Sequence, residues 1–246
     1  YVPETLPTLR FAELADCRTL ADTANRVLAP FLEGSSLADQ LEEITAESLN
    51  LPLPIIEFER GRSWMLELFH GPTAAFKDFA ARFLAACMAR LRKPDDPVQT
   101  IVVATSGDTG GAVAAAFHQR PGFRVVILYP KGRVSARQAH QLGAFGDNIH
   151  TFNVTGDFDD CQRLAKQALG DPEVAETLHL TSANSISIGR LLPQITYYAH
   201  ASTQLFRKTS AAMDVIVPTG NLGNALACVL ARRIGLPIGE VVLATN

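Results

Sequence analysis

The sequence has no apolar run near the roughly 20 residues that a membrane-spanning helix needs, and no secretory signal opens it. Basic residues are not in excess, because 22 Lys and Arg stand against 25 Asp and Glu, for a net charge of −3. The sequence therefore lacks the excess of positive charge that is typical of nucleic-acid-binding proteins. Repeats and low-complexity tracts are also missing. We expect a cytoplasmic protein without a membrane or nucleic-acid partner.

Cysteine is scarce and scattered. The four cysteines are Cys17, Cys87, Cys161 and Cys228. They lie too far apart for the spacing of a metal site. We expect reduced thiols in the protein core and no bound metal.

What the chain does have is enough apolar sequence for good cores, since 47% of its 246 residues are hydrophobic. Helical patterns occupy residues 1–50 and end at a Leu-Pro-Leu-Pro break at 51–54. Beyond it, apolar strand-like runs alternate with helical patterns, which predicts an α/β fold with mainly parallel sheets. The expected strands are 64–69, 100–104, 124–129, 149–154 and 214–218.

Lys77 follows the Gly71-Pro72 turn and stands at or next to the start of a predicted helix. Helices usually place acids at this end, because the positive end of the helix dipole disfavours a cation. A lysine there, flanked by Phe76 and Phe79, is a candidate for a depressed pKa and for Schiff-base chemistry. The alternative is an ordinary lysine that reaches solvent.

Residues 214–224 read as a buried strand, a glycine-containing turn with Gly220 and Gly223, and the start of a helix that Gly235 stops. Free backbone N–H groups and the helix dipole make such a turn an anion site, with phosphate the expected anion. The spacing fits neither a Walker loop nor the dinucleotide fingerprint. Ordinary turn glycines are the alternative.

Residues 100–118 repeat this pattern as a strand, the turn 105–111 and a helix over 112–118. The small residues of the turn would let a carboxylate or phosphate approach the backbone closely. Ser106 is not the nucleophile of a hydrolase, since Ala104 stands where that motif needs glycine. A plain helix cap by Ser, Asp or Thr is the alternative.

Together these segments resemble the threonine synthases, a family of fold-type II pyridoxal-phosphate enzymes. The resemblance rests on Leu-Glu-Leu-Phe-His-Gly-Pro-Thr at 66–73 running into Ala-Phe-Lys-Asp-Phe at 75–79, and on Ala-Thr-Ser-Gly-Asp-Thr-Gly at 104–110. It also rests on Ser-Ala-Asn-Ser-Ile at 182–186 and Val-Pro-Thr-Gly-Asn-Leu-Gly-Asn at 217–224. It extends over the whole chain.

The resemblance implies a two-lobed, tryptophan synthase β-like fold that holds pyridoxal 5'-phosphate. Residues 1–55 would form an N-terminal helical segment, and 96–194 the smaller α/β lobe. Residues 56–95 and 195–246 would belong to the large cofactor-binding lobe.

The resemblance also implies roles for individual residues. Lys77 would be catalytic and would hold the cofactor covalently, and Asp108 would face its 3'-oxygen. The cofactor phosphate would be cradled by Gly220, Asn221, Leu222, Gly223 and Asn224. Substrate would be bound by Ser106, Gly107, Thr109, Gly110, Ser182, Asn184 and Arg190. Arg190 suits a substrate phosphate because guanidinium binds phosphate bidentately; a structural salt bridge is its alternative role.

The implied reaction converts O-phospho-L-homoserine and water to L-threonine and phosphate, the last step of threonine biosynthesis. Such an enzyme is a carbon–oxygen lyase acting on phosphates, here as a monomer or homodimer. Two alternatives stay open. One is another fold-type II enzyme, such as a serine/threonine dehydratase or a cysteine-synthase-like enzyme. The other is a non-catalytic phosphate-binding α/β module.

Both ends of the sequence suggest a piece of a longer chain. It begins at Tyr1 rather than methionine and stops soon after the strand-like Val241-Val242-Leu243. We expect a fragment that lacks the C-terminal part, including the partner of the cofactor's pyridine nitrogen. The isolated fragment should therefore turn over poorly.

Overall fold

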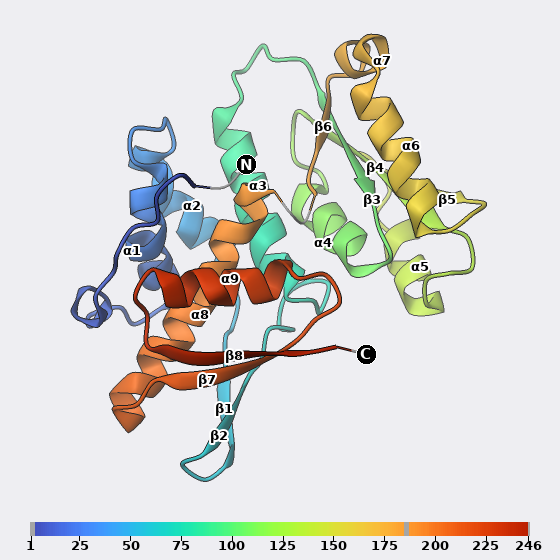
Figure 1. Ribbon diagram of the computed structural model, residues 1–246. Helices are drawn as coiled ribbons and strands as arrows, with labels where there is room; N and C mark the ends of the chain where they lie inside the picture. The colour runs from blue at the N-terminus through green and yellow to red at the C-terminus, as the bar shows by residue number, and fades with distance from the viewer. Residues whose placement is uncertain (1–2, 185–186, 246) are drawn as a thin grey trace. The chain divides into compact units, whose positions relative to one another are not determined.

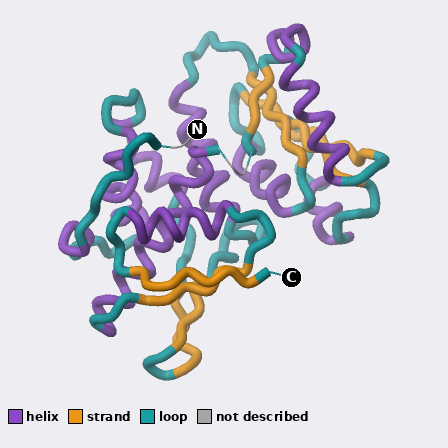
Figure 2. Tube along the Cα trace, in the orientation of Figure 1, coloured by secondary structure: helices purple, strands orange, loops and turns teal. Residues whose placement is uncertain are grey.

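The computed structural model describes residues 3–184 and 187–245. They form two compact units, one from residues up to His70 together with those from 187 onward, and a second from Gly71 to Asn184. Figure 1 labels the elements and Figure 2 colours them by type. Both units combine helices with strands, which confirms the predicted α/β class.

The second unit is built on a four-stranded sheet in the order β5-β4-β3-β6. Every neighbouring pair in it is parallel, and Ile101 stands beside Val125, which stands beside Ile149. The strands are β3 (Gln99–Ala104), β4 (Phe123–Pro130), β5 (Ile149–Val154) and β6 (Leu180–Ser182). The predicted parallel α/β character is therefore confirmed in this unit.

Helices cover both faces of this sheet (Figure 1). Successive strand residues point to opposite faces, and Ile101 and Val103 join the core that α3 and α4 cover. On the other face α6 packs on β3 and β4. The helices of the unit are α3 (Lys77–Leu91), α4 (Asp108–Phe117), α5 (Ala136–Gly143), α6 (Phe158–Gly170) and α7 (Pro172–Thr177).

Small side chains let α3 pack closely on α4. Ala81 and Ala85 of α3 share one buried cluster with Val113 and Phe117 of α4. The Phe117 ring meets the Phe123 ring edge-on, with ring centroids 5.1 Å apart. This is a favoured geometry for a buried aromatic pair.

The predicted division of the chain differs from these units. Residues 71–95 were assigned to the large lobe, but α3 belongs to the second unit because its alanines pack on α4. The predicted boundary at 194–195 falls inside α8 (Ile188–Thr209), a continuous helix of the first unit. The spacing of apolar residues locates helices and strands along the chain, but it does not show which other elements they pack against. The assignment of lobes to functions stays a prediction.

The first unit centres on α8, which packs against α1 and α9. Its buried residues include Ile195 and Tyr197. The other helical elements are η1 (Phe11–Leu14), α1 (Leu20–Leu32), η2 (Ala38–Gln40), α2 (Leu41–Ser48) and α9 (Gly223–Arg233). The helical N-terminal segment is thus present, and it ends before the predicted break at 51–54.

Two strand pairs complete this unit. The hairpin of β1 (Ile55–Glu59) and β2 (Ser63–Leu66) is antiparallel, and β2 ends earlier than the predicted strand 64–69. β7 (Met213–Pro218) and β8 (Ile238–Ala244) are parallel, and α9 joins them as the crossover helix that parallel strands require. Their side chains Ile216 and Val242 are exposed.

Candidate active site

Lys77 is the first residue of α3, as predicted for a lysine at a helix start. The preceding residue, Phe76, has a helical backbone conformation and provides no side-chain cap. The Lys77 ammonium lies 5.6 Å from the centroid of the Phe76 ring, and 16% of the side chain is exposed. The amine is thus sheltered by an aromatic ring and still reachable by a small molecule.

The turn before Lys77 is fixed by the next residue, Asp78. Its carboxylate is only 1% exposed and accepts hydrogen bonds from the Thr73 backbone N–H at 2.9 Å and the Thr73 hydroxyl at 2.6 Å. A Cβ added to Gly71 would collide with this carboxylate. Glycine is therefore required at position 71 by close approach, and the backbone around Lys77 is held in place.

The turn between β3 and α4 is organised by a buried side chain, Thr105. Its hydroxyl oxygen accepts from the backbone N–H groups of Gly107 at 3.0 Å and Gly110 at 2.9 Å. Gly107 has φ +142°, which favours glycine. These two bonds fix the shape of the turn, and the N–H groups of Ser106 and Thr109 are among the donors that Thr105 does not occupy.

Asp108 joins this turn to Lys77. Its Oδ2 lies 3.5 Å from the Lys77 Nζ, and its Oδ1 accepts from the Gln138 amide at 2.7 Å. Gln138 also closes the capping box of α5 with Ser135. The structure therefore brings the predicted catalytic lysine and the predicted substrate-binding turn together, with a carboxylate beside the amine.

The helix that follows this turn begins earlier than predicted. α4 starts at Asp108 rather than Ala112, so Thr109 and Gly110 lie in its first turn. Gly110 is buried close to Thr105 and Leu142. The small residues that the sequence suggested for ligand contact thus serve helix packing as well.

Ser182 and Asn184 lie at the same edge of the sheet as the Thr105 turn. β6 runs parallel to β3, with Ser182 beside Val102. The carboxyl ends of neighbouring parallel strands meet at one edge, where ligands of α/β proteins commonly bind. Both residues are exposed. The predicted Ser185 and Ile186 lie outside the described residues.

In the first unit, the predicted phosphate turn joins β7 to α9. The Thr219 N–H donates to the Ala244 carbonyl at 3.0 Å, and its hydroxyl donates to the Asn221 carbonyl at 2.8 Å. Gly220, Asn221 and Leu222 are exposed, and Leu222 gives α9 no side-chain cap. The open helix start has the character of an anion site.

Asn224 differs from the rest of this turn. Its side chain is buried, and its Oδ1 accepts from the hydroxyls of Tyr197 at 2.5 Å and Tyr198 at 2.9 Å. Burial raises the pKa of both tyrosines, so both hydroxyls stay protonated donors. Only the backbone of Asn224 remains for the predicted role in the turn.

Arg190 lies in the first turn of α8 and is 1% exposed. Burial lowers the pKa of its guanidinium to about 10, so the group stays charged at neutral pH. The Gln194 amide donates to the Arg190 carbonyl at 2.6 Å. A buried charge needs an anionic or hydrogen-bonding partner. A substrate phosphate and an internal ion pair both meet that need, and the role stays a prediction.

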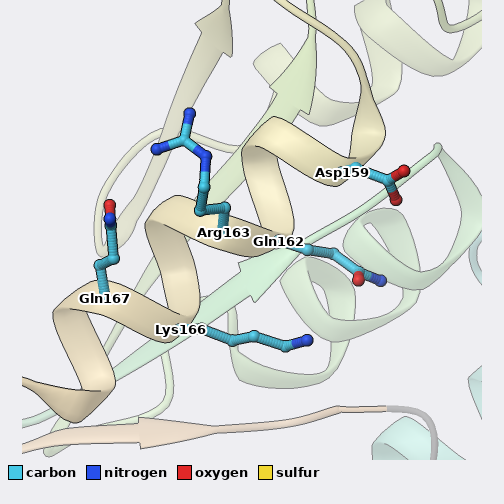
Figure 3. A pocket seen from close by; sticks show the side chains of 5 residues that line it. All are labelled: Asp159, Gln162, Arg163, Lys166 and Gln167. Atoms are coloured by element: carbon cyan, nitrogen blue, oxygen red, sulfur yellow. The ribbon is translucent and has the colours of Figure 1, made fainter.

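A shallow hollow on α6 contains none of the predicted site residues (Figure 3). Its lining comes from one helix, and the Arg163 guanidinium already pairs with Asp160 at 2.9 Å. The lining residues are Asp159, Gln162, Arg163, Lys166 and Gln167. This is the solvated face of an amphipathic helix.

The described residues contain no cluster of His, Cys, Asp and Glu fit for a metal ion. Over the same residues, no helix has both the length and the apolar character to cross a membrane. All four cysteines are buried, and burial raises the pKa of Cys228 to about 12.

Several residues that shape the site were not predicted from sequence. Gln138 had a readable local signal, because Ser135 and Gln138 match the capping-box spacing. Its bond to Asp108, 30 residues away, had none. The roles of Thr105, Asp78 and Tyr197 likewise depend on contacts that only the folded chain shows.

Comparisons with known proteins agree on one family. The family model described as "Pyridoxal-phosphate dependent enzyme" matches residues 51–245. The threonine synthase of Escherichia coli is 43% identical over 248 residues, covering 100% of this chain and 57% of that protein. The chain thus spans little more than half the length of this curated relative.

Solved structures give the same result. A crystal structure of the Escherichia coli threonine synthase has a TM-score of 0.90 at 42% identity, covering 99% of this chain and 57% of that one. A pyridoxal-phosphate-bound threonine synthase from Brucella melitensis has a TM-score of 0.87 at 37% identity, covering 100% of this chain and 54% of that one.

Proposed function

This chain belongs to the pyridoxal-phosphate dependent enzyme family, and we propose that the protein it represents is a threonine synthase. The proposed reaction converts O-phospho-L-homoserine and water to L-threonine and inorganic phosphate. The observation that carries the proposal is the likeness to threonine synthases along the whole chain. The pairing of Lys77 with the Asp108 turn supports it.

The residues present fit the cofactor. Lys77 offers a primary amine that is partly sheltered but accessible. The turn before α9 offers exposed backbone at an uncapped helix start, and a Cβ at Gly220 would meet nothing within 4 Å, so there is open space beside the turn. An amine and a phosphate cradle are the two features that pyridoxal phosphate requires.

In this proposal Lys77 would hold the cofactor through its amine, and the N–H groups of residues 220–224 would hold its phosphate. When bound, pyridoxal phosphate supplies an electron sink for the negative charge that develops on the substrate. Asp108 would keep the lysine amine oriented, since its carboxylate already lies 3.5 Å from the Nζ.

Lys77 would also move the proton at the substrate Cα. A group that both takes and returns a proton works best with a pKa near the working pH. Ser106, Gly107, Thr109 and Gly110 would bind the substrate carboxylate at the start of α4, where the helix dipole favours an anion. The small side chains of this turn permit close approach to the backbone.

The substrate phosphate would be bound by Ser182, Asn184 and Arg190. Two observations support this set. Ser182 and Asn184 follow β6 at the ligand-binding edge of the sheet, and Arg190 carries a buried positive charge. A phosphate would meet that charge with strong, bidentate hydrogen bonds.

The decisive test is product analysis with the full-length parent protein. Incubated with pyridoxal phosphate and O-phospho-L-homoserine, it should release inorganic phosphate and L-threonine in equal amounts. Conversion of L-serine or L-threonine to an oxoacid, without phosphate release from the phosphorylated substrate, would instead identify a dehydratase and refute the proposal. The cytoplasmic location and the choice between monomer and homodimer stay predictions.

A further inference from the structure

Three buried side chains stand directly behind the predicted cofactor-phosphate turn. We propose that Tyr197 and Tyr198, acting through Asn224, are positioning residues that hold the start of α9 in the geometry that binds the cofactor phosphate. This inference rests on the proposed cofactor site. Both tyrosine side chains are buried and bond to the Asn224 side chain, so in this proposal they act through the backbone that Asn224 anchors.

The contacts place the anchor at the right point. Asn224 is the second residue of α9, immediately after the turn formed by 219–223. Both tyrosine hydroxyls converge on its single Oδ1, at 2.5 and 2.9 Å. The two tyrosine rings also pack on each other, with centroids 4.8 Å apart.

Tyr197, Tyr198 and Asn224 are all buried, so the loss of a hydrogen bond between them is costly. Tyr197 is 0% exposed, Tyr198 3% and Asn224 8%. At this depth water does not replace a lost tyrosine hydroxyl, so the side-chain Oδ1 of Asn224 would be left without that hydrogen bond. The second residue of a helix contributes one of the free N–H groups that face an anion. A shift of Asn224 therefore moves that donor.

Tyr197 also has a polar neighbour within its own helix, α8. Its hydroxyl lies 3.2 Å from the Gln194 Oε1, and the Gln194 amide donates to the Arg190 carbonyl at 2.6 Å. Asn224 at the start of α9 thus lies next to a group of buried polar side chains on α8. A hydroxyl has one hydrogen, and its shorter contact is to Asn224, so the bond to Asn224 is the stronger one.

The test compares two ligands that differ only in the phosphate. The affinities of pyridoxal phosphate and pyridoxal are measured by fluorescence titration of the chain and of its full-length parent, and their ratio reports on the phosphate turn alone. In the double variant Tyr197→Phe/Tyr198→Phe this ratio should fall by about tenfold, corresponding to two lost buried hydrogen bonds. Pyridoxal affinity should change little.

Thr196→Val is the matched control. Thr196 is a buried hydroxyl residue on the same helix, but it donates to the Pro193 carbonyl at 2.6 Å rather than to Asn224. This variant should lose stability while keeping the affinity ratio. If the double variant does not fold, each single Tyr→Phe change should lower the ratio by a smaller factor.

An unchanged ratio in folded Tyr→Phe variants would overturn the inference, and so would a wild-type protein that does not prefer pyridoxal phosphate over pyridoxal. Failure of the proposed reaction gives a different result. In that case the wild type keeps its preference and the variants lose it, while no phosphate is released from O-phospho-L-homoserine.

Discussion

Helix starts in this protein fall into two groups. α1, α5 and α6 begin with Thr19, Ser135 and Asp157, each of which closes a capping box. α3, α4, α8 and α9 begin after Phe76, Gly107, Ser187 and Leu222, none of which gives a side-chain cap. The uncapped group contains every helix start at which we propose that cofactor or substrate carboxylate binds.

The difference shows how the sequence separates stability from binding. A capping side chain satisfies free N–H groups and stabilises a helix by about 1 kcal/mol. The same N–H groups cannot then bind an anion. Helices α1, α5 and α6 use the cap. At α4 Thr105 occupies the Gly110 N–H but not that of Thr109, and α9 has no side-chain cap, so both starts keep donors for the ligands that we propose there. α2 is a separate case, because it continues directly from η2.

The largest expected effect is at the start of α3. Lys77→Ala should abolish both turnover by the full-length protein and covalent attachment of pyridoxal phosphate, because no other residue supplies the amine at this position. Borohydride reduction followed by peptide mass spectrometry detects the adduct. Lys166→Ala on α6 is the matched control and should keep both properties. Retained activity in Lys77→Ala would refute the assignment.

Leu222→Asp places an acidic side chain at an uncapped helix start and tests the comparison directly. The new carboxylate should compete for the N–H groups of α9 and repel phosphate, so affinity for pyridoxal phosphate should fall by more than about tenfold. The same charge should stabilise the helix by about 0.5 kcal/mol. Titration and urea unfolding measure the two effects, with Leu222→Asn as the uncharged control.

If Leu222→Asp instead left the affinity unchanged, the turn before α9 would not be the phosphate site. A loss of affinity without any gain in stability would show that the helix start has no capping capacity, which would weaken the comparison between the two groups of helices.

Asp157→Ala is the opposite change, since it removes a cap from α6. Its carboxylate accepts from the Asp160 N–H at 3.0 Å, and its loss should lower the free energy of unfolding by about 1 kcal/mol. Affinity for pyridoxal phosphate should stay the same. Urea unfolding followed by circular dichroism measures the loss, and a matching loss of affinity would contradict the separation.

The smallest effect concerns pH at the capped start of α1. His200 lies 3.0 Å from the hydroxyl of Thr23 in the first turn of α1. Burial lowers the pKa of His200, Arg207 lowers it further, and Asp22 opposes this. The unfolded chain therefore takes up this proton at a higher pH than the folded chain does, so stability should fall as pH drops below about 6.5.

The melting temperature measured between about pH 7 and pH 5 gives this slope. His200→Gln keeps a polar side chain but cannot titrate there, and its slope should be flatter than that of the wild type. Equal slopes would show that His200 does not contribute to the acid sensitivity.

Local signals in the sequence predicted much of this arrangement. The helix start at Lys77, the strand–turn–helix segments around Gly107 and Gly220, and the stop of α9 before Pro237 are confirmed. Each depends on glycine, proline or apolar spacing within a few residues, which a sequence displays directly.

What could not be predicted depends on contacts between distant residues. Leu91 lies at helical spacing from the apolar residues Leu84 and Met88, which favours a buried position, but it is 55% exposed, whereas Ala81 and Ala85 are buried. Alanine carries little pattern signal, so the helix face that packs on α4 was not visible. The bond between Gln138 and Asp108 and the convergence of Tyr197 on Asn224 also join residues far apart in sequence.

The two hydrogen bonds between Thr73 and the Asp78 carboxylate limit how the backbone of Lys77 can move. Thr73 bonds to the Asp78 carboxylate, and Gly71 packs against it. The backbone that carries Lys77 is therefore held in place. In the proposed reaction, the amine would move between reacting atoms by rotation about its own side-chain bonds. In that reaction, an amine on a fixed backbone would stay at high effective concentration beside the groups with which it reacts.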